Sequence, residues 1–370
     1  MAVLNVISTT TTPLAASATY TGETAEVGGY TSVRADVATD QDGAVYLEFS
    51  QDGAAWDVAL PVKVRANKAK SVAARVQGRF CRVHYVNNAS TQTTFRLSCR
   101  LTLETHLPTG DDFSAVQADL VPGWIAVTII GDNESVSTTE GTVWEAPTIG
   151  GDNRVTFPEA ASVAVASTDA ADTSAGTGAR TFLITGLDAS NNVQTPIVTM
   201  NGTTEVNLPG TWNAINGVVM LSAGSGGINA GNVWVGAQGT FTSGKPSTGN
   251  QYNVVRAAAG GVSETAAYRV PANCTLYQRH VYLDGEGNKD IEFKFNGQTT
   301  LGGPVLVLYR ATISGNLNDF NADLAVPGAE AGTTIEMTAE TASGVDKARL
   351  FMFARLRTHY THDTIPALLP

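Results

Sequence analysis

The segment Thr93–Leu103 reads TTFRLSCRLTL, and from Phe95 to Leu101 every second residue is apolar. Alternation with period two indicates a β-strand that buries one face and exposes the other. The same pattern recurs in Ala44–Ser50, Gly78–Val86, Ala179–Leu187 and Lys289–Asn296. The runs break at Gly, Asn, Asp or Pro, and such regular turn residues are typical of sandwiches and barrels rather than βαβ units.

The chain contains no convincing long amphipathic helix. One short helix is expected within Asp111–Leu120, where Phe113, Val116 and Leu120 are spaced for one helical face. We therefore predict an all-β fold of tandem antiparallel β-sandwich or jelly-roll-like modules, with at most that one short linker helix.

A chain of 370 residues exceeds what one hydrophobic core usually organises, so several modules are expected. Segments rich in Gly, Ala, Ser and Pro suggest where the modules end. The expected division is 1–106 as an N-terminal β-sandwich, 107–123 as a linker, 124–242 as a middle β-sandwich, 243–252 as a second linker, 253–358 as a C-terminal jelly-roll-like β-sandwich and 359–370 as an extended tail.

Charged residues make up 15% of the chain, against about 25% in typical soluble domains. The net charge of −11 is uneven, because residues 107–262 hold four Lys or Arg against thirteen Asp or Glu. Such an acidic surface repels nucleic acid, so we expect no nucleic acid partner. The chain opens without a signal peptide and has no apolar run of the ~20 residues that a membrane span needs. We therefore expect synthesis in a cytosol and no membrane insertion.

Basic residues concentrate in the first module. Seven of its ten Lys and Arg form a cluster in the sequence: Lys63, Arg65, Lys68, Lys70, Arg75, Arg79 and Arg82. The first four are candidates for an attachment surface that meets an acidic partner. The alternative is a solvated strand face that carries long cationic side chains.

Three cysteines are too few for a disulfide framework. If Gly78–Val86 and Thr93–Leu103 form a hairpin around Asn88–Ser90, Cys81 lies opposite Cys99 and both side chains enter the core. In a reducing cytosol we expect buried thiols that act as small apolar side chains.

One acidic loop imitates a calcium site. Oxygen-bearing side chains alternate at Asp284, Glu286, Asn288 and Asp290, as they do in the first half of a calcium-binding loop. Lys289 occupies the sixth position, where that loop requires Gly. A Gly-rich hairpin is therefore the favoured interpretation, and the sequence predicts neither a bound metal nor a cofactor.

The sequence contains no recognisable catalytic constellation. Neither a Ser–His arrangement nor a phosphate-binding loop can be identified, so we expect no enzymatic activity and assign no catalytic residue. Trp124, Trp144, Trp212 and Trp234 fall in the acidic middle of the chain. Exposed tryptophans suit sugar-binding surfaces, but core positions are the more usual place for them in a β-domain.

Several turn-and-strand patterns resemble a known family. They are Glu26–Tyr30, Leu47–Ser50 and Phe80–Asn87 in the first module, Thr168–Arg180 and Ala223–Asn232 in the middle module, and Tyr268–Ala272 and Asp290–Phe293 in the last. These patterns are similar to the β-sandwich modules in virion proteins of tailed bacteriophages.

The resemblance implies a structural component of the virion that is assembled in the host cytoplasm. The first expectation is a tail-associated fibre, adaptor or baseplate-type protein that forms a symmetric homo-oligomer, either a trimer or a ring. Its basic N-terminal module would attach to other virion proteins. One alternative is a capsid-exterior decoration or head-fibre protein. The other is a carbohydrate-binding adhesin module that recognises a host surface glycan.

Overall fold

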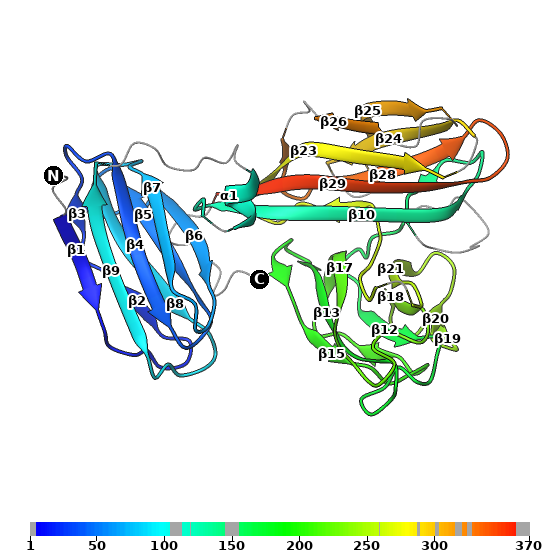
Figure 1. Ribbon diagram of the computed structural model, residues 1–370, viewed down its shortest axis with the longest axis horizontal. Helices are drawn as coiled ribbons and strands as arrows, with labels where there is room; N and C mark the ends of the chain where they lie inside the picture. The colour runs from blue at the N-terminus through cyan, green and yellow to red at the C-terminus, as the bar shows by residue number, and fades with distance from the viewer. Residues whose placement is uncertain are drawn as a thin grey trace. The chain divides into compact units, whose positions relative to one another are not determined.

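The protein was analysed as a computed structural model, which describes residues 5–103, 113–118, 120–144, 155–258, 260–286, 289–299, 303–314, 320–323 and 328–359. Antiparallel sheets make up most of these residues, and α1 (Phe113–Gln117) is their one α-helix. The predicted all-β fold with one short helix is confirmed. The chain divides into two compact units, Met1–Ala126 with Arg355–Pro370, and Val127–Ala354 (Figure 1). No helix among the described residues is long and apolar enough to cross a membrane.

The first unit contains a sandwich of two antiparallel sheets. One sheet has the strand order β1-β9-β4-β7, and the other has the order β2-β8-β5-β6 with β3 beside β8. The bounds are β1 (Asn5–Thr10), β2 (Thr19–Thr21), β3 (Ala25–Glu26), β4 (Ser32–Thr39), β5 (Gly43–Ser50), β6 (Val58–Val64), β7 (Lys70–Arg75), β8 (Phe80–Asn87) and β9 (Phe95–Thr102).

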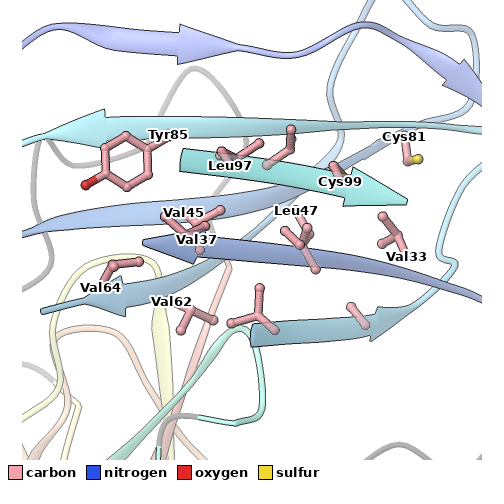
Figure 2. Packing of buried hydrophobic residues seen from close by; sticks show 14 of the residues in the cluster. Val33, Val37, Val45, Leu47, Val62, Val64, Cys81, Tyr85, Leu97 and Cys99 are labelled. Atoms are coloured by element: carbon pink, nitrogen blue, oxygen red, sulfur yellow. The ribbon is translucent and has the colours of Figure 1, made fainter. Parts of the chain in front are cut away.

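Alternate residues of these strands fill the space between the two sheets (Figure 2). Val33 and Val37 enter it from β4, and Val45 and Leu47 enter it from β5. Each is almost completely buried, so truncation of Leu47 to Ala is expected to cost about 2–5 kcal/mol of stability. The period-two pattern of the sequence is thus the pattern of inward and outward side chains.

The expected hairpin between Gly78–Val86 and Thr93–Leu103 is wrong. β8 pairs with β5 and β2, whereas β9 pairs with β4 and β1, so the two strands belong to different sheets. Their side chains meet across the core instead, where the rings of Tyr85 and Phe95 lie 4.7 Å apart between centroids. Alternation identifies which side chains point inward. It does not distinguish two strands that pair within one sheet from two strands that pack against each other across the core, because both arrangements bring the same inward side chains together.

The cysteines are buried free thiols, as expected. Burial raises the pKa of the Cys81 thiol to about 12. Burial also raises the pKa of Cys99, and the neighbouring Cys81 adds to the effect. Both thiols therefore stay protonated and behave as small apolar side chains in the core.

The second unit begins with β10 and β11 and then builds the middle sheets. One middle sheet has the order β16-β12-β18-β21, and the other has β14-β13-β15 with β17 beside β13. The bounds are β12 (Val163–Ser167), β13 (Ala179–Asp188), β14 (Val193–Gln194), β15 (Ile197–Thr199), β16 (Val206–Asn207), β17 (Trp212–Ala223), β18 (Val233–Ala237), β19 (Phe241–Thr242), β20 (Lys245–Pro246) and β21 (Gln251–Val255).

A buried carboxylate holds the loops of the middle sheets together. Asp172 accepts hydrogen bonds from Ser167 Oγ at 2.5 Å and from the backbone N–H of Ala179 at 2.6 Å. It also accepts from the N–H groups of Ala230 and Gly231, both at 2.9 Å. These partners lie in or directly beside the segments Thr168–Arg180 and Ala223–Asn232, whose patterns resemble phage modules. Asp172 therefore joins the two segments, which gives both a structural role.

The remaining strands of the second unit form two further sheets. Their orders are β10-β29-β23-β26 with β27 beside β23, and β11-β28-β24-β25 with β22 beside β28. The bounds are β10 (Trp124–Val136), β11 (Gly141–Thr142), β22 (Ala267–Arg269), β23 (Cys274–Gly285), β24 (Ile291–Gln298), β25 (Leu306–Ile313), β26 (Phe320–Asp323), β27 (Ala329–Glu330), β28 (Thr334–Thr341) and β29 (Asp346–Thr358).

Strand pairing differs from the expected module ranges for three strands. β10 and β11 lie within the range expected for the middle module but pair with β29 and β28 of the last one. β21 begins inside the expected linker 243–252 and pairs with β18 of a middle sheet. Local alternation does not reveal a partner more than 200 residues away. Residues 107–112 and 119 of the expected linker 107–123 lie outside the described residues, and so do residues 360–370 of the expected tail 359–370.

Candidate binding site beside a ring of alternating charges

The candidate site lies on the outer face of the sheet that contains β10, β29 and β23. Side chains two residues apart in a strand share a face. Asp132 and Glu134 in β10 therefore project on the same side, and so do Lys347 and Arg349 in β29. Because β10 and β29 are neighbours in the sheet, the acidic pair faces the basic pair.

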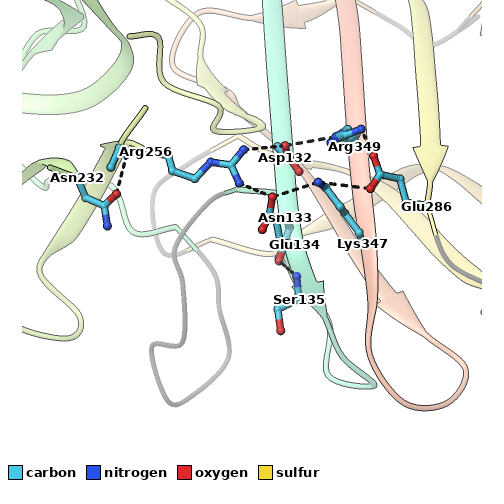
Figure 3. A network of polar contacts seen from close by, with 10 residues as sticks. Asp132, Asn133, Glu134, Ser135, Asn232, Arg256, Glu286, Lys347 and Arg349 are labelled. Atoms are coloured by element: carbon cyan, nitrogen blue, oxygen red, sulfur yellow. Dashed lines mark hydrogen bonds and ion pairs between the residues drawn. The ribbon is translucent and has the colours of Figure 1, made fainter. Parts of the chain in front are cut away.

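Three acidic and three basic side chains form a closed ring of contacts (Figure 3). Asp132 Oδ2 lies 3.5 Å from Arg256 Nη2 and 3.4 Å from Arg349 Nε. Glu134 accepts a hydrogen bond from Arg256. The same Glu134 oxygen lies 3.1 Å from Lys347 Nζ.

Glu286, directly after β23, closes the ring. Its Oε2 lies 3.5 Å from Lys347 Nζ, and its Oε1 accepts a hydrogen bond from Arg349. Each charge thus has two neighbours of opposite sign, which offsets the cost of partial burial. Arg256 follows β21, so the ring links the middle sheets to the sheet of β10 and β29.

Contacts within the ring shift the pKa values of Glu134 and Lys347 in the directions that keep these two groups charged. Hydrogen bonds from Arg256 and Lys347 lower the pKa of Glu134. Burial by itself would lower the pKa of Lys347, but the hydrogen bond to Glu134 and the charge of Asp132 outweigh it, and the pKa is raised. Glu134 and Lys347 therefore stay charged at neutral pH.

A pocket of about 280 Å³ opens beside the ring. It is lined by Ile130, Gly131, Asp132, Arg256, Glu264, Arg349 and Phe351. Asp132 is only 6% exposed, and its Oδ1 has no hydrogen-bond partner among the described residues. Glu264 Oε2 is likewise buried and, within the same ranges, without a partner. Asp132 and Glu264, which line the pocket, thus each have one buried carboxylate oxygen whose hydrogen-bonding capacity is unused.

Glycine at position 131 allows the segment that carries Glu264 to lie close to β10. A Cβ on Gly131 would be 2.5 Å from Val143 O and 2.7 Å from Ala266 Cβ, closer than real side chains approach. Burial raises the pKa of Glu264, and the negative charge of Asp132 raises it further. The two carboxylates are thus close enough to repel each other.

Of the four metal candidates, Asp284 lies in β23, Glu286 directly follows that strand and Asp290 directly precedes β24. Glu286 is a member of the ring, with Lys347 and Arg349 as partners. Asn288 lies outside the described residues. Among the residues that are described, no group of three or more His, Cys, Asp or Glu is arranged to hold a metal.

The basic attachment candidates belong to the first unit. Lys63 lies in β6 between buried Val62 and Val64, so its side chain points away from the core. Arg65 and Lys68 are exposed in the loop that joins β6 to β7. β6 is the last strand in the order of one sheet and β7 is the last strand in the order of the other. The loop therefore crosses from one sheet to the other.

Lys70 has a different environment from the other three attachment candidates. Its Nζ donates a hydrogen bond to Ala118 O at 2.9 Å. It also lines a pocket of about 380 Å³ over the sheet of β1, β9, β4 and β7. The carboxylate in this larger pocket, Asp36, contacts Arg100 at 2.5 Å and accepts a hydrogen bond from Ser71. Asp36, unlike Asp132 and Glu264, has no buried carboxylate oxygen without a hydrogen-bond partner, so we favour the pocket beside the ring as the binding site.

Two of the other basic residues are paired within the first unit. Arg82 lies 2.5 Å from the buried Glu48 and stacks 3.9 Å from the centre of the Trp56 ring. Arg79 lies 2.9 Å from Glu26. These contacts match the alternative of a cationic strand face more closely than a surface reserved for a partner.

Three of the four tryptophans proposed for sugar contact are core residues. Trp144, Trp212 and Trp234 are almost fully buried. Trp124 is partly exposed and lies beside Arg355 and Arg357, with the guanidinium carbons 5.4 and 6.0 Å from its ring centre. The core interpretation is therefore correct for Trp144, Trp212 and Trp234.

Sequence reasoning missed the ring, although a signal for it exists. Like charges at positions i and i+2 of a strand lie on one face and repel unless opposite charges face them. Asp132 with Glu134, and Lys347 with Arg349, have this spacing. Two such pairs of opposite sign predict neighbouring strands, but the local pattern does not identify Arg256 or Glu264.

Comparison with known proteins gives one family and several distant structures. The model of the family described as "Uncharacterised protein YqxG N-terminal domain" matches residues 1–102. No curated protein matches the chain.

Among solved structures, the PBSX exported protein XepA is 12% identical at a TM-score of 0.25, covering 95% of this chain and 86% of that one. The tail fibre protein gp63.1 of an E. coli phage is 8% identical at a TM-score of 0.19, covering 97% of this chain and 40% of the fibre. The CBM22-1-CBM22-2 tandem domain of Paenibacillus barcinonensis Xyn10C is 9% identical at a TM-score of 0.21, covering 96% and 93%. We therefore argue function from this chain's own residues.

Proposed function

We propose that the protein is a non-enzymatic structural component of a tailed phage virion that assembles as a symmetric homo-oligomer. The proposed assembly rests on a row of exposed apolar side chains across strands β15, β13 and β17. Ile197 and Val219 are the cross-strand partners of Leu183, and Val262 forms a bridge with Val219. Residues paired in this way share one face of the sheet.

The row is open to solvent in the single chain. Ile197 is 65% exposed, Val219 37% and Val262 38%. Leu221, two residues beyond Val219 on the same strand, is 49% exposed. Contiguous apolar surface of this kind marks a contact site more often than isolated exposed residues do. In a chain with few charges, it supports burial against a neighbouring subunit.

A second apolar surface lies on β25. Leu306 and Val307 of this strand and Val305 directly before it are about half exposed, and β25 ends the strand order of its sheet. Two different apolar surfaces on one unit favour a heterologous contact, in which one patch of each subunit meets the other patch of the next. Heterologous contacts that close give rings, so the arrangement supports a trimer or a larger ring.

Light scattering coupled to size exclusion tests the assembly. The purified chain should elute as a multiple of 38.6 kDa. Ile197→Lys should shift it toward the monomer, because a buried unpaired charge opposes association. Val345→Lys is the matched control, since Val345 is 58% exposed in the loop between β28 and β29 and belongs to neither patch. A wild-type chain that stays monomeric both in solution and on particles would contradict the proposal.

The virion assignment rests on the resemblance of the sequence to phage β-sandwich modules, with the tail as the proposed position. Immunogold labelling of purified particles tests it. Label on the tail supports the fibre, adaptor or baseplate role. Label confined to the capsid supports the decoration or head-fibre alternative. Particles that carry no label would exclude a virion component.

A further inference from the structure

We propose that the pocket beside the charge ring binds one sugar unit of a glycan. The proposal goes beyond assembly and does not depend on it. Its starting point is the pair of unused acceptors, Asp132 Oδ1 and Glu264 Oε2, which are buried without a hydrogen-bond partner among the described residues. A buried carboxylate oxygen left unpaired is unfavourable, so a ligand hydroxyl that enters the pocket and donates a hydrogen bond to it gains affinity.

The charges around the pocket favour a neutral ligand with many hydroxyl groups. Arg256 and Arg349 line the pocket and would repel a cation, whereas Asp132 and Glu264 would repel an anion. A sugar hydroxyl both donates and accepts, so it satisfies a carboxylate on one side and a guanidinium on the other. Donors and acceptors placed together in this way suit a polyol.

Phe351 supplies an apolar wall for a sugar ring. It lies two residues beyond Arg349 in β29, so the two side chains share the outer face. Its ring is 36% exposed, and the Tyr282 ring lies 6.2 Å from it between centroids. An aromatic face that is partly exposed and held by a neighbour buries the C–H face of a sugar at little entropic cost.

The size of the pocket indicates how much of a glycan it holds. Pockets for drug-sized ligands usually measure about 300–1,000 Å³. At about 280 Å³ this pocket accommodates one ring rather than an extended oligosaccharide. We therefore expect a single terminal or branching residue of the glycan to enter, with affinity of about 1 mM for the free monosaccharide.

Saturation-transfer NMR with a panel of neutral hexoses, deoxyhexoses and N-acetylhexosamines tests the site on the full chain. At least one sugar should give a signal, and Glu264→Gln and Phe351→Ala should each weaken binding about tenfold, or ~1.4 kcal/mol. Glu292→Gln and Leu103→Ala are matched controls, because Glu292 pairs with Arg310 on another sheet and Leu103 is an exposed apolar residue of the first unit. The controls should leave binding unchanged.

Three results would overturn the proposal. One is the absence of signal for every sugar in the panel. Another is wild-type affinity in both Glu264→Gln and Phe351→Ala, since any bound sugar would then lie elsewhere. The third is stabilisation by Ca²⁺ alone that Glu264→Gln abolishes, which would assign the unused oxygens to a cation. Circular dichroism of each variant must match the wild type, so that loss of folding is not read as loss of binding.

Discussion

Arg256 Nη2 lies 3.5 Å from Asp132 Oδ2, although 124 residues separate the two in sequence. Arg256 follows the last strand of the middle sheets, and Asp132 lies in a strand that pairs with β29. A single guanidinium thus connects two sets of sheets within the second unit, at the edge of a pocket that holds unused acceptors.

Removal of Arg256 should weaken this connection. In Arg256→Met, Asp132 keeps Arg349 as its ring partner and Glu134 keeps Lys347. We therefore expect the free energy of unfolding to fall by about 1–2 kcal/mol, which lies between the values for exposed and buried ion pairs. Urea unfolding followed by tryptophan fluorescence measures it. Arg310→Met, which breaks the more exposed pair with Glu292, should change stability by less than about 0.5 kcal/mol. Equal effects of the two substitutions would contradict a connecting role for Arg256.

The raised pKa of Glu264 predicts an unusual dependence of stability on pH. Because the folded-state pKa is above the unfolded value near 4.5, ionisation of Glu264 destabilises the fold at neutral pH, and protonation relieves the cost as pH falls through the folded pKa. Glu264→Gln should therefore melt higher than the wild type at pH 7. The difference should shrink toward zero as the pH is lowered to about 4. Scanning calorimetry across this range checks the sign; a variant that melts lower at pH 7 would show that the carboxylate stabilises the fold.

Glu134 should behave in the opposite way. Hydrogen bonds from Arg256 and Lys347 lower its pKa, so its contribution to stability is present above the unfolded value of 4.5 and is lost as pH falls through the folded pKa. Glu134→Gln should melt lower than the wild type at pH 7, and the two melting curves should converge in acid. Thermal melts at a series of pH values measure this. If the difference in melting temperature between the wild type and Glu134→Gln grew as the pH fell, the ion pairs of Glu134 would not be what stabilises the fold.

Asp172 should be the most sensitive polar position in the middle sheets. In Asp172→Asn, an NH₂ group replaces one of the two oxygens that accept hydrogen bonds from Ser167, Ala179, Ala230 and Gly231, and donors then face a donor. We expect a loss of about 3 kcal/mol, measured by chemical denaturation. Asp169→Asn, at a more exposed turn carboxylate, should cost less than about 1 kcal/mol. A near-neutral Asp172→Asn would mean that the loops are held by other contacts.

The thiols should be unreactive in the folded protein. Cys81, Cys99 and Cys274 are all buried, and the raised pKa values of Cys81 and Cys99 keep those two protonated. Because the thiolate is the reactive form, a thiol reagent at pH 8 should label these residues only after denaturation. Mass spectrometry after a short alkylation counts the labelled thiols. Rapid labelling of Cys81 in the native state would imply that the first sandwich opens.

Most of the strands could be predicted, because the face that a side chain takes is a local property. Lys63 between Val62 and Val64 is outward because its neighbours are inward, and this follows from period-two geometry alone. The short helix α1 was visible for the same reason, as a local spacing of apolar residues. Of the site, the sequence singled out only Glu286, which was weighed as a metal candidate and interpreted as part of a Gly-rich hairpin; its place in the ring was not foreseen.

By itself, the amino-acid sequence determined that the chain is all-β, that its turns fall at Gly, Asn, Asp and Pro, and which side chains turn inward. The tertiary structure alone decided that β8 and β9 face each other from separate sheets, and that β10 pairs with β29. It alone brought Arg256 and Glu264 to Asp132. The physical reason is that alternation records a preference for core or solvent, whereas the choice of strand partner depends on the packing of segments far apart along the chain.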